Sequence, residues 1–175
     1  MTAVADAVSV ESVSVKPELF EAVQNSVRNA MTMCGLKARC TGVSSVPAQQ
    51  SGIVTGMIGV HGKVTGFATV NMAERFAIRA VEGLLGDEHG KLTSQVVDGA
   101  GEITNIIVGG IKSSLAKTNW GFSHITVPSV LVGNNVTIAY ARGLDFLTVS
   151  FELDDPEAVR LEERMMHVSL SLLTL

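Results

Sequence analysis

The chain has 175 residues, of which 46% are hydrophobic, and it carries 13 Lys and Arg against 17 Asp and Glu, a formal net charge of −4. This length and apolar fraction are typical of one globular domain whose core needs neither a disulfide nor a metal. No two basic residues are adjacent, which argues against a nucleic-acid partner, and the apolar runs are too short for a membrane span.

Residues 1–15 alternate valine with small or acidic residues, and we expect a flexible segment there, followed by a single domain over residues 16–175. The start lacks a basic residue and contains Asp6 and Glu11, which is unlike a secretory signal. Cys34 and Cys40 have five residues between them, a spacing that matches no zinc or redox motif. We therefore predict reduced thiols in a cytoplasmic protein.

The first half of the chain predicts two helices separated by a β-hairpin. Pro17 is typical of a first helical turn, and the apolar spacing predicts a helix to about Met33, ended by Gly35. Residues 52–72 alternate with a period of two and predict two strands with a tight turn at His61-Gly62. A second helix is predicted over residues 72–85.

The second half predicts a long helix from about Ser94, a natural N-cap, to about Ala116. Three strands are then expected over residues 123–133, 135–142 and 146–153, followed by a short polar helix near 155–163 and a closing strand over 167–175. The order of helices and hairpins predicts an α/β or α+β fold in which long helices pack on a mainly antiparallel sheet.

An offset of 81 residues suggests an internal repeat, so that the domain would consist of two related halves. The matched pairs are Glu21 with Glu102, Gln24 with Asn105, Pro47 with Pro128, and Gly62 with Gly143.

The predicted helix over 94–116 contains four glycines, at positions 99, 101, 109 and 110, although each interior glycine costs about 1 kcal/mol relative to alanine. On a helical wheel one stripe is apolar and faces the core: Val96, Ala100, Ile103, Ile107 and Ile111. The opposite face carries Asp98, Glu102, Asn105, Gly109 and Lys112, with Gly101 at its border.

Glu102 and Asn105 therefore lie one turn apart on the solvent side. By composition alone, an ordinary solvated face is the favoured interpretation, because such pairs are common. The loss of helix stability from glycine at positions 101 and 109 argues against that interpretation, because we expect both positions to be exposed and able to hold alanine. Glycine there makes sense if another molecule approaches the helix closely. The pattern thus suggests a docking surface that presents Glu102 and Asn105.

Residues 98–115, followed by residues 126–133, resemble the signature of the CheC/CheX/FliY family of chemotaxis phosphatases. That signature has an acidic or Ser residue, three residues, Glu, two residues, Asn, 22 residues and Pro. Here the matching residues are Asp98, Glu102, Asn105 and Pro128. The order of helices and hairpins resembles the family over most of residues 16–175, which implies a CheX-like fold.

The first half carries a degraded copy of the motif. Glu21, Gln24 and Pro47 keep the spacing, but Gln replaces Asn, and Pro17 stands where Asp or Ser belongs. This points to the single-motif CheX type rather than the two-motif CheC type. The FliY type would need an additional flagellar-switch domain. The resemblance to CheX also implies a homodimer.

The resemblance implies a phosphatase that acts on the aspartyl phosphate of a CheY-type response regulator in two-component signalling. Asn105 would position the attacking water and Glu102 would pair with the regulator's lysine, while Asp98, Gly101, Gly109 and Lys112 would contact the partner. Magnesium would belong to the regulator, so we expect neither a cofactor nor a metal in this chain. Two alternatives remain at this point: a non-catalytic dimeric module that binds receiver domains, and a purely structural dimer.

Overall fold

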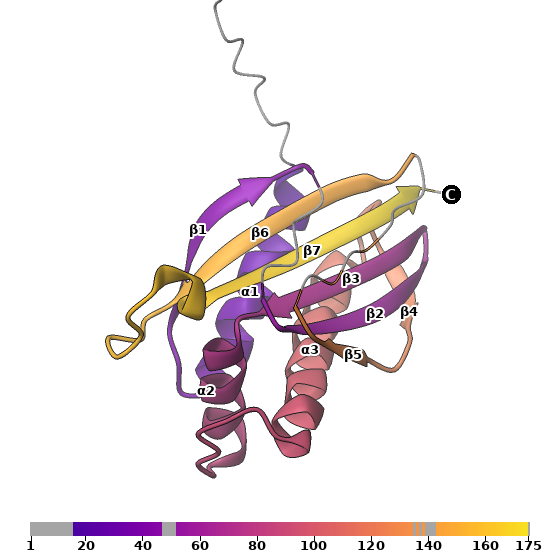
Figure 1. Ribbon diagram of the computed structural model, residues 1–175. Helices are drawn as coiled ribbons and strands as arrows, with labels where there is room; N and C mark the ends of the chain where they lie inside the picture. The colour runs from indigo at the N-terminus through magenta and orange to yellow at the C-terminus, as the bar shows by residue number, and fades with distance from the viewer. Residues whose placement is uncertain (1–15, 47–51, 135, 137, 139–142, 175) are drawn as a thin grey trace, which may run out of the picture.

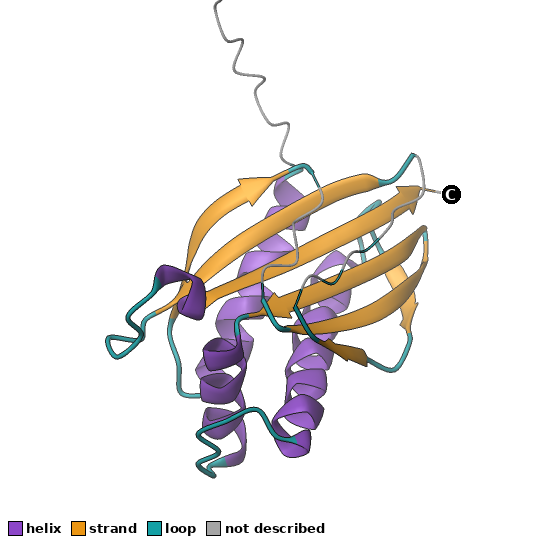
Figure 2. Ribbon diagram, viewed as in Figure 1, coloured by secondary structure: helices purple, strands orange, loops and turns teal. Residues whose placement is uncertain are grey.

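The computed structural model describes residues 16–46, 52–134, 136, 138 and 143–174. Within these residues, three α-helices cover one face of a seven-stranded sheet (Figures 1 and 2). This arrangement confirms the predicted mixed α/β class. The segment 1–15, Pro47 and most of the strand predicted over 135–142 lie outside the described residues.

The three helices match the sequence predictions closely. Helix α1 (Pro17–Met33) begins at its proline, and α2 (Glu74–Leu85) ends at Gly86, whose φ of 80° is left-handed. Helix α3 (Ser94–Leu115) has a different N-cap from the one expected. The Thr93 hydroxyl accepts the Val96 N–H at 3.3 Å, so Ser94 is already the first helical residue.

The seven strands are all paired antiparallel. They are β1 (Ala38–Ser44), β2 (Val54–Gly62), β3 (Val64–Met72), β4 (Phe122–Ile125), β5 (Ser129–Val132), β6 (Asp145–Leu153) and β7 (Met165–Thr174). The sheet order is β1-β6-β7-β3-β2-β4, and β5 pairs with the other end of β2.

Two predicted elements differ from the structure. The strand expected over 123–133 is divided into β4 and β5 at Pro128, which has no N–H to offer a sheet ladder. The helix expected near 155–163 is instead a loop followed by one 3₁₀ turn, η1 (Leu161–Arg164). In that loop Asp155 accepts the Glu157 N–H and holds Arg75, an arrangement that replaces helical hydrogen bonds.

The sheet order shows the two related halves, because the strands of one half mirror those of the other about the centre of the sheet. The central strand β7 corresponds to β3, and β6 corresponds to β2. At the edges, β1 corresponds to β4 and β5. The offset is therefore not constant along the chain, because β2 begins at Val54 and β6 begins 91 residues later (145 − 54) at Asp145. The matched pair Gly62 and Gly143 is consequently not equivalent in the fold. Gly62 ends β2, whereas Gly143 precedes β6.

The core lies between the helices and the inner face of the sheet. The predicted apolar stripe of α3 is fully buried in it, and the alternating residues Met166, Val168, Leu170 and Leu172 of β7 contribute from the sheet side. Cys34 is buried, which raises its thiol pKa to about 11, and both cysteines are free. None of the helices in the described part of the chain combines the length and apolarity needed to span a membrane.

Two of the four α3 glycines are explained by this packing. A β-carbon on Gly99 would lie 2.6 Å from Cγ1 of Val81 in α2, and one on Gly110 would lie 2.8 Å from Oγ of Ser26 in α1. The absence of side chains at these positions lets α1 and α2 approach α3 closely.

Candidate functional site

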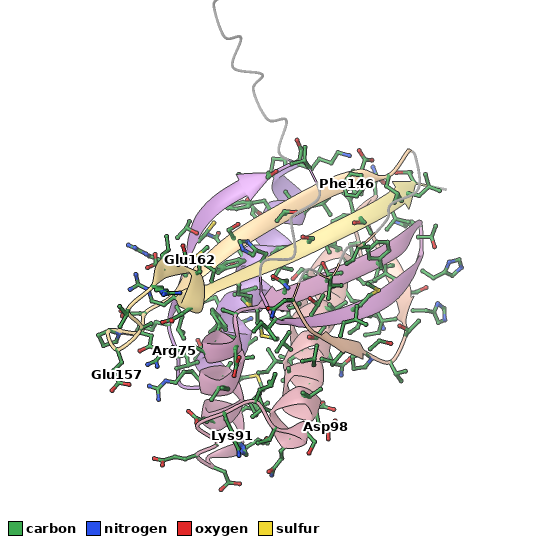
Figure 3. All side chains as sticks on the ribbon, viewed as in Figure 1. Arg75, Lys91, Asp98, Phe146, Glu157 and Glu162 are labelled. Atoms are coloured by element: carbon green, nitrogen blue, oxygen red, sulfur yellow. The ribbon has the colours of Figure 1, made fainter. Side chains whose placement is uncertain are left out.

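The outward face of α3 presents the predicted acid–amide pair. Asp98, Glu102 and Asn105 are all exposed, and spacings of four and three residues place them on one side of the helix. Figure 3 shows Asp98 projecting outward from α3. Because the opposite stripe of α3 is buried in the core, this face is fixed in its orientation.

Neither the Glu102 nor the Asn105 side chain has a hydrogen-bond or ion-pair partner within the described part of the chain. The pair is not part of an internal network that stabilises the fold. Both polar groups are therefore available to a second molecule.

The structure distinguishes the two glycines that were expected to be exposed. Gly109 is half-buried rather than exposed, but no atom outside the backbone of its own helix lies within 4 Å of the position of a β-carbon, so it has the room for alanine that was predicted. Gly101 is buried, contrary to the prediction, because β5 and the residue before it pack on it. A β-carbon there would lie 3.3 Å from Cγ2 of Val130 and 3.8 Å from Cγ of Pro128. Gly101 thus lets β5 and Pro128 pack against α3, and of these two glycines only Gly109 leaves the helix backbone accessible to another molecule.

Pro128 and its neighbours form the border of the site. The connection between β4 and β5 lies beside Gly101, one residue before Glu102 along the helix. The Thr126 N–H donates to the Gly59 carbonyl at 3.0 Å, which fixes this connection to β2. Val127 is 82% exposed at the same corner. Pro128, although distant from α3 in the sequence, is thereby placed against the helix at Gly101.

Lys112 lies at the other end of the same face, in the last turn of α3, and is half-buried. It lines a hollow together with Lys63 from the β2–β3 turn. Lys63 was not predicted as a site residue, because nothing in the sequence indicates that residue 63 approaches residue 112.

The degraded motif on α1 has a different setting. Glu21 is exposed and Gln24 is half-buried, while Phe20 and Arg28 stand where the second motif has Gly101 and Gly109. Phe20 packs against the core cluster, and Arg28 is exposed. This part of α1 has no open backbone comparable with that at Gly109.

A larger hollow, about 710 Å³, lies between the start of α2 and residues 157–163. Its Arg75 is ion-paired with Asp155 at 2.7 Å and with Glu157 at 3.2 Å, on the side of the molecule away from Asp98 (Figure 3). The Arg75 guanidinium lowers the pKa of the Asp155 carboxyl. These charges satisfy one another, so we assign them a structural role. Among the described residues, no group of three or more His, Cys, Asp or Glu side chains could hold a metal ion.

Residues 54–152 match the model of the family described as chemotaxis phosphatase CheX, a range that includes Asp98, Glu102, Asn105 and Pro128. The chain belongs to this family. The match does not extend to Glu21 and Gln24. No curated protein matches the chain significantly in sequence.

The fold of this CheX-family chain is that of solved chemotaxis proteins. The chemotaxis protein CheX from Vibrio vulnificus is 23% identical with a TM-score of 0.74, over 89% of this chain and 99% of that one. A putative chemotaxis protein from Desulfovibrio vulgaris Hildenborough is 24% identical with a TM-score of 0.76, over 92% and 99%. A chain in the CheX-CheY-BeF3-Mg complex from Borrelia burgdorferi is 20% identical with a TM-score of 0.68, over 90% and 96%.

Proposed function

We propose that this CheX-family protein hydrolyses the aspartyl phosphate of a CheY-type response regulator in the cytoplasm, as part of chemotaxis signalling. The observation that carries the proposal is the exposed pair Glu102 and Asn105, whose side chains have no partner among the described residues, on a helix fixed by its buried face. The family description and the solved complex of a CheX with CheY support both the activity and the partner.

Asn105 positions the attacking water. An aspartyl phosphate is a mixed anhydride, and its hydrolysis proceeds through a loose transition state that asks mainly for positioning and charge stabilisation. The Asn105 carboxamide oxygen accepts a hydrogen bond from a water and holds it in line with the P–O bond that breaks. The products are inorganic phosphate and the free aspartate. A strong base is unnecessary, and placement of one water can supply several kcal/mol.

Glu102 orients the helix over the regulator. Its carboxylate, one turn from Asn105, pairs with the lysine beside the regulator's phosphoaspartate. Asp98 adds negative charge to the same face, and Gly109 lets the regulator's backbone approach. The magnesium ion belongs to the regulator in this mechanism, and this chain contributes no metal of its own.

The homodimer implied by the family resemblance is part of the same proposal, and analytical ultracentrifugation of the purified protein tests it. A single species at the monomer mass, at micromolar concentration, would exclude a stable dimer. The location of Glu102 and Asn105 within one chain makes the chemistry independent of this result.

The decisive experiment measures the lifetime of the acyl phosphate on a panel of CheY-type receiver domains, with and without the protein. We expect the lifetime of the cognate phosphoprotein to fall at least tenfold in the presence of catalytic amounts. Binding of a phosphorylated receiver domain without a shorter lifetime would instead identify a non-catalytic binding module. Absence of any binding would leave only a structural role.

A further inference from the structure

A second hollow, of about 410 Å³, lies at the C-terminal end of α3, where the β2–β3 turn and the start of β4 meet the helix. Its floor includes Gly62, Gly121 and Phe122, and its charged side chains are Lys63 and Lys112. We call it the two-lysine hollow. Pairing of Gly62 with Phe122 in the sheet holds the β2–β3 turn against β4, so the hollow is built on fixed elements.

The two-lysine hollow is positively charged in a protein whose net charge is −4. No acidic residue lines it, and no carboxylate of the described residues forms an ion pair with Lys112. The Lys63 ammonium donates to the Thr118 carbonyl at 2.9 Å, beyond the last turn of α3. This contact holds Lys63 beside the end of α3, where the hollow lies.

The hollow and the candidate site lie along the same helix, α3. Lys112 lies seven residues beyond Asn105, about 10 Å along the helix at a rise of about 1.5 Å per residue. Gly109 lies between them and leaves its surroundings open. A molecule that rests on Asn105 can therefore extend over Gly109 and reach Lys112 without meeting a side chain at position 109.

We propose that the two-lysine hollow binds an acidic segment of the same regulator, with an Asp or Glu carboxylate held by Lys112 and Lys63. This inference rests on the proposed function. The exposed face of α3 then presents two opposite charges to the regulator. Glu102 attracts a lysine, and Lys112, about 15 Å further along the helix, attracts a carboxylate. Only a partner with that separation of charges satisfies both, so the hollow selects among receiver domains and fixes their orientation.

The experiment uses the receiver domain whose phosphate the wild-type protein removes, activated with beryllofluoride and Mg²⁺. Its Kd is measured by titration calorimetry at low and high NaCl concentration for wild type, Lys112→Gln, Lys112→Arg and Lys117→Gln. Lys117 is an exposed lysine just beyond α3 that does not line the hollow. Lys117→Gln removes one positive charge, as Lys112→Gln does, and therefore controls for the change in net charge. Circular dichroism and Tm confirm that each variant is folded.

We expect Lys112→Gln to raise Kd about three- to tenfold and to weaken its dependence on salt, with Lys112→Arg and Lys117→Gln close to wild type. At saturating regulator the hydrolysis rate of the control Lys117→Gln should equal that of wild type, because Lys117 is exposed and does not line the hollow. We also expect Lys112→Glu to bind more weakly still, and one Asp→Lys or Glu→Lys change on the regulator to restore its affinity.

The outcomes separate the two proposals. Normal hydrolysis by wild type, together with equal Kd values for Lys112→Gln and Lys117→Gln, would overturn the role of the hollow and leave the phosphatase proposal intact. Failure of any regulator charge reversal to rescue Lys112→Glu would also count against the hollow. If wild type neither binds nor dephosphorylates any receiver domain, both proposals fail together.

Discussion

Gly101 of α3 lies directly beneath Val130 and Pro128, so that a β-carbon on it would be 3.3 Å from Cγ2 of Val130. This contact holds the β4–β5 corner beside Glu102 and forms one border of the docking face. Gly109, two turns further along α3, has no neighbouring strand or side chain within 4 Å of the position of a β-carbon. The two glycines were expected to act alike and have different physical roles.

Substituting these two glycines with leucine should therefore give opposite effects on stability. Gly101→Leu would overpack the contact with Val130 and Pro128 and should destabilise the protein by about 1–3 kcal/mol. Gly109→Leu should hold or raise Tm, because leucine exceeds glycine in helix propensity by roughly 0.5–1 kcal/mol. Yet Gly109→Leu should weaken regulator binding. Tm and Kd are measured for both variants, and unchanged affinity of Gly109→Leu would remove that glycine from the docking face.

Asn105→Ala should abolish the accelerated dephosphorylation while leaving the fold and the affinity for the regulator nearly intact. Asn105 is exposed, so its truncation opens no cavity. Phosphate release is measured with the variant at saturating regulator, and Kd is measured in parallel. A folded Asn105→Ala protein with wild-type turnover would refute the proposed mechanism.

Glu102→Ala should lower both binding and turnover, and Glu102→Lys should lower them further because it repels the regulator's lysine. We expect a loss of affinity of about tenfold or more for the charge reversal. Glu88→Lys, at an exposed loop residue outside α3, serves as the control for a change of net charge. Equal binding by wild type and both Glu102 variants would contradict the pairing role.

Gln24→Ala should leave turnover within a factor of about two, a negligible change in transition-state energy. Gln24 carries its amide one methylene further out than Asn would, and an ångström-scale misplacement costs on the order of 100-fold. Phe20 and Arg28 also occupy the positions that correspond to Gly101 and Gly109. We therefore expect one active site per chain. A large loss of turnover in folded Gln24→Ala would indicate two sites.

Asp155→Asn should lower the free energy of unfolding at pH 7 by about 1–3 kcal/mol, because it removes a charged partner from Arg75. The side chain of Asp155 is 2% exposed, and hydrogen bonding to Arg75 lowers the pKa of its carboxyl in the folded protein. A lowered folded pKa stabilises the fold above the unfolded pKa of about 3.9, and this stabilisation is lost as the pH falls through the folded pKa.

The difference between wild type and Asp155→Asn should consequently shrink between pH 7 and pH 3. Urea unfolding at both pH values measures it, with the exposed neighbour Asp154→Asn as control. A difference that stays constant over this range would mean that the Asp155 charge does not contribute to stability.

The sequence by itself determined the helices, most strands and the acid–amide pair. Helical spacing of apolar residues and terminal signals such as Pro17 and Gly35 act within a few residues, so they can be read from the chain directly. The same holds for Glu102 and Asn105, whose shared face follows from helical geometry once the stripe from Val96 to Ile111 faces the core.

Only the tertiary structure decided what surrounds that face. Whether Gly101 is open or covered depends on where β5 lies, and β5 is placed by its pairing with β2, more than 70 residues earlier in the chain (129 − 57 = 72). The two-lysine hollow likewise depends on the β2–β3 turn reaching the end of α3. Local sequence signals do not encode such contacts, because they arise from the packing of distant segments around a common core.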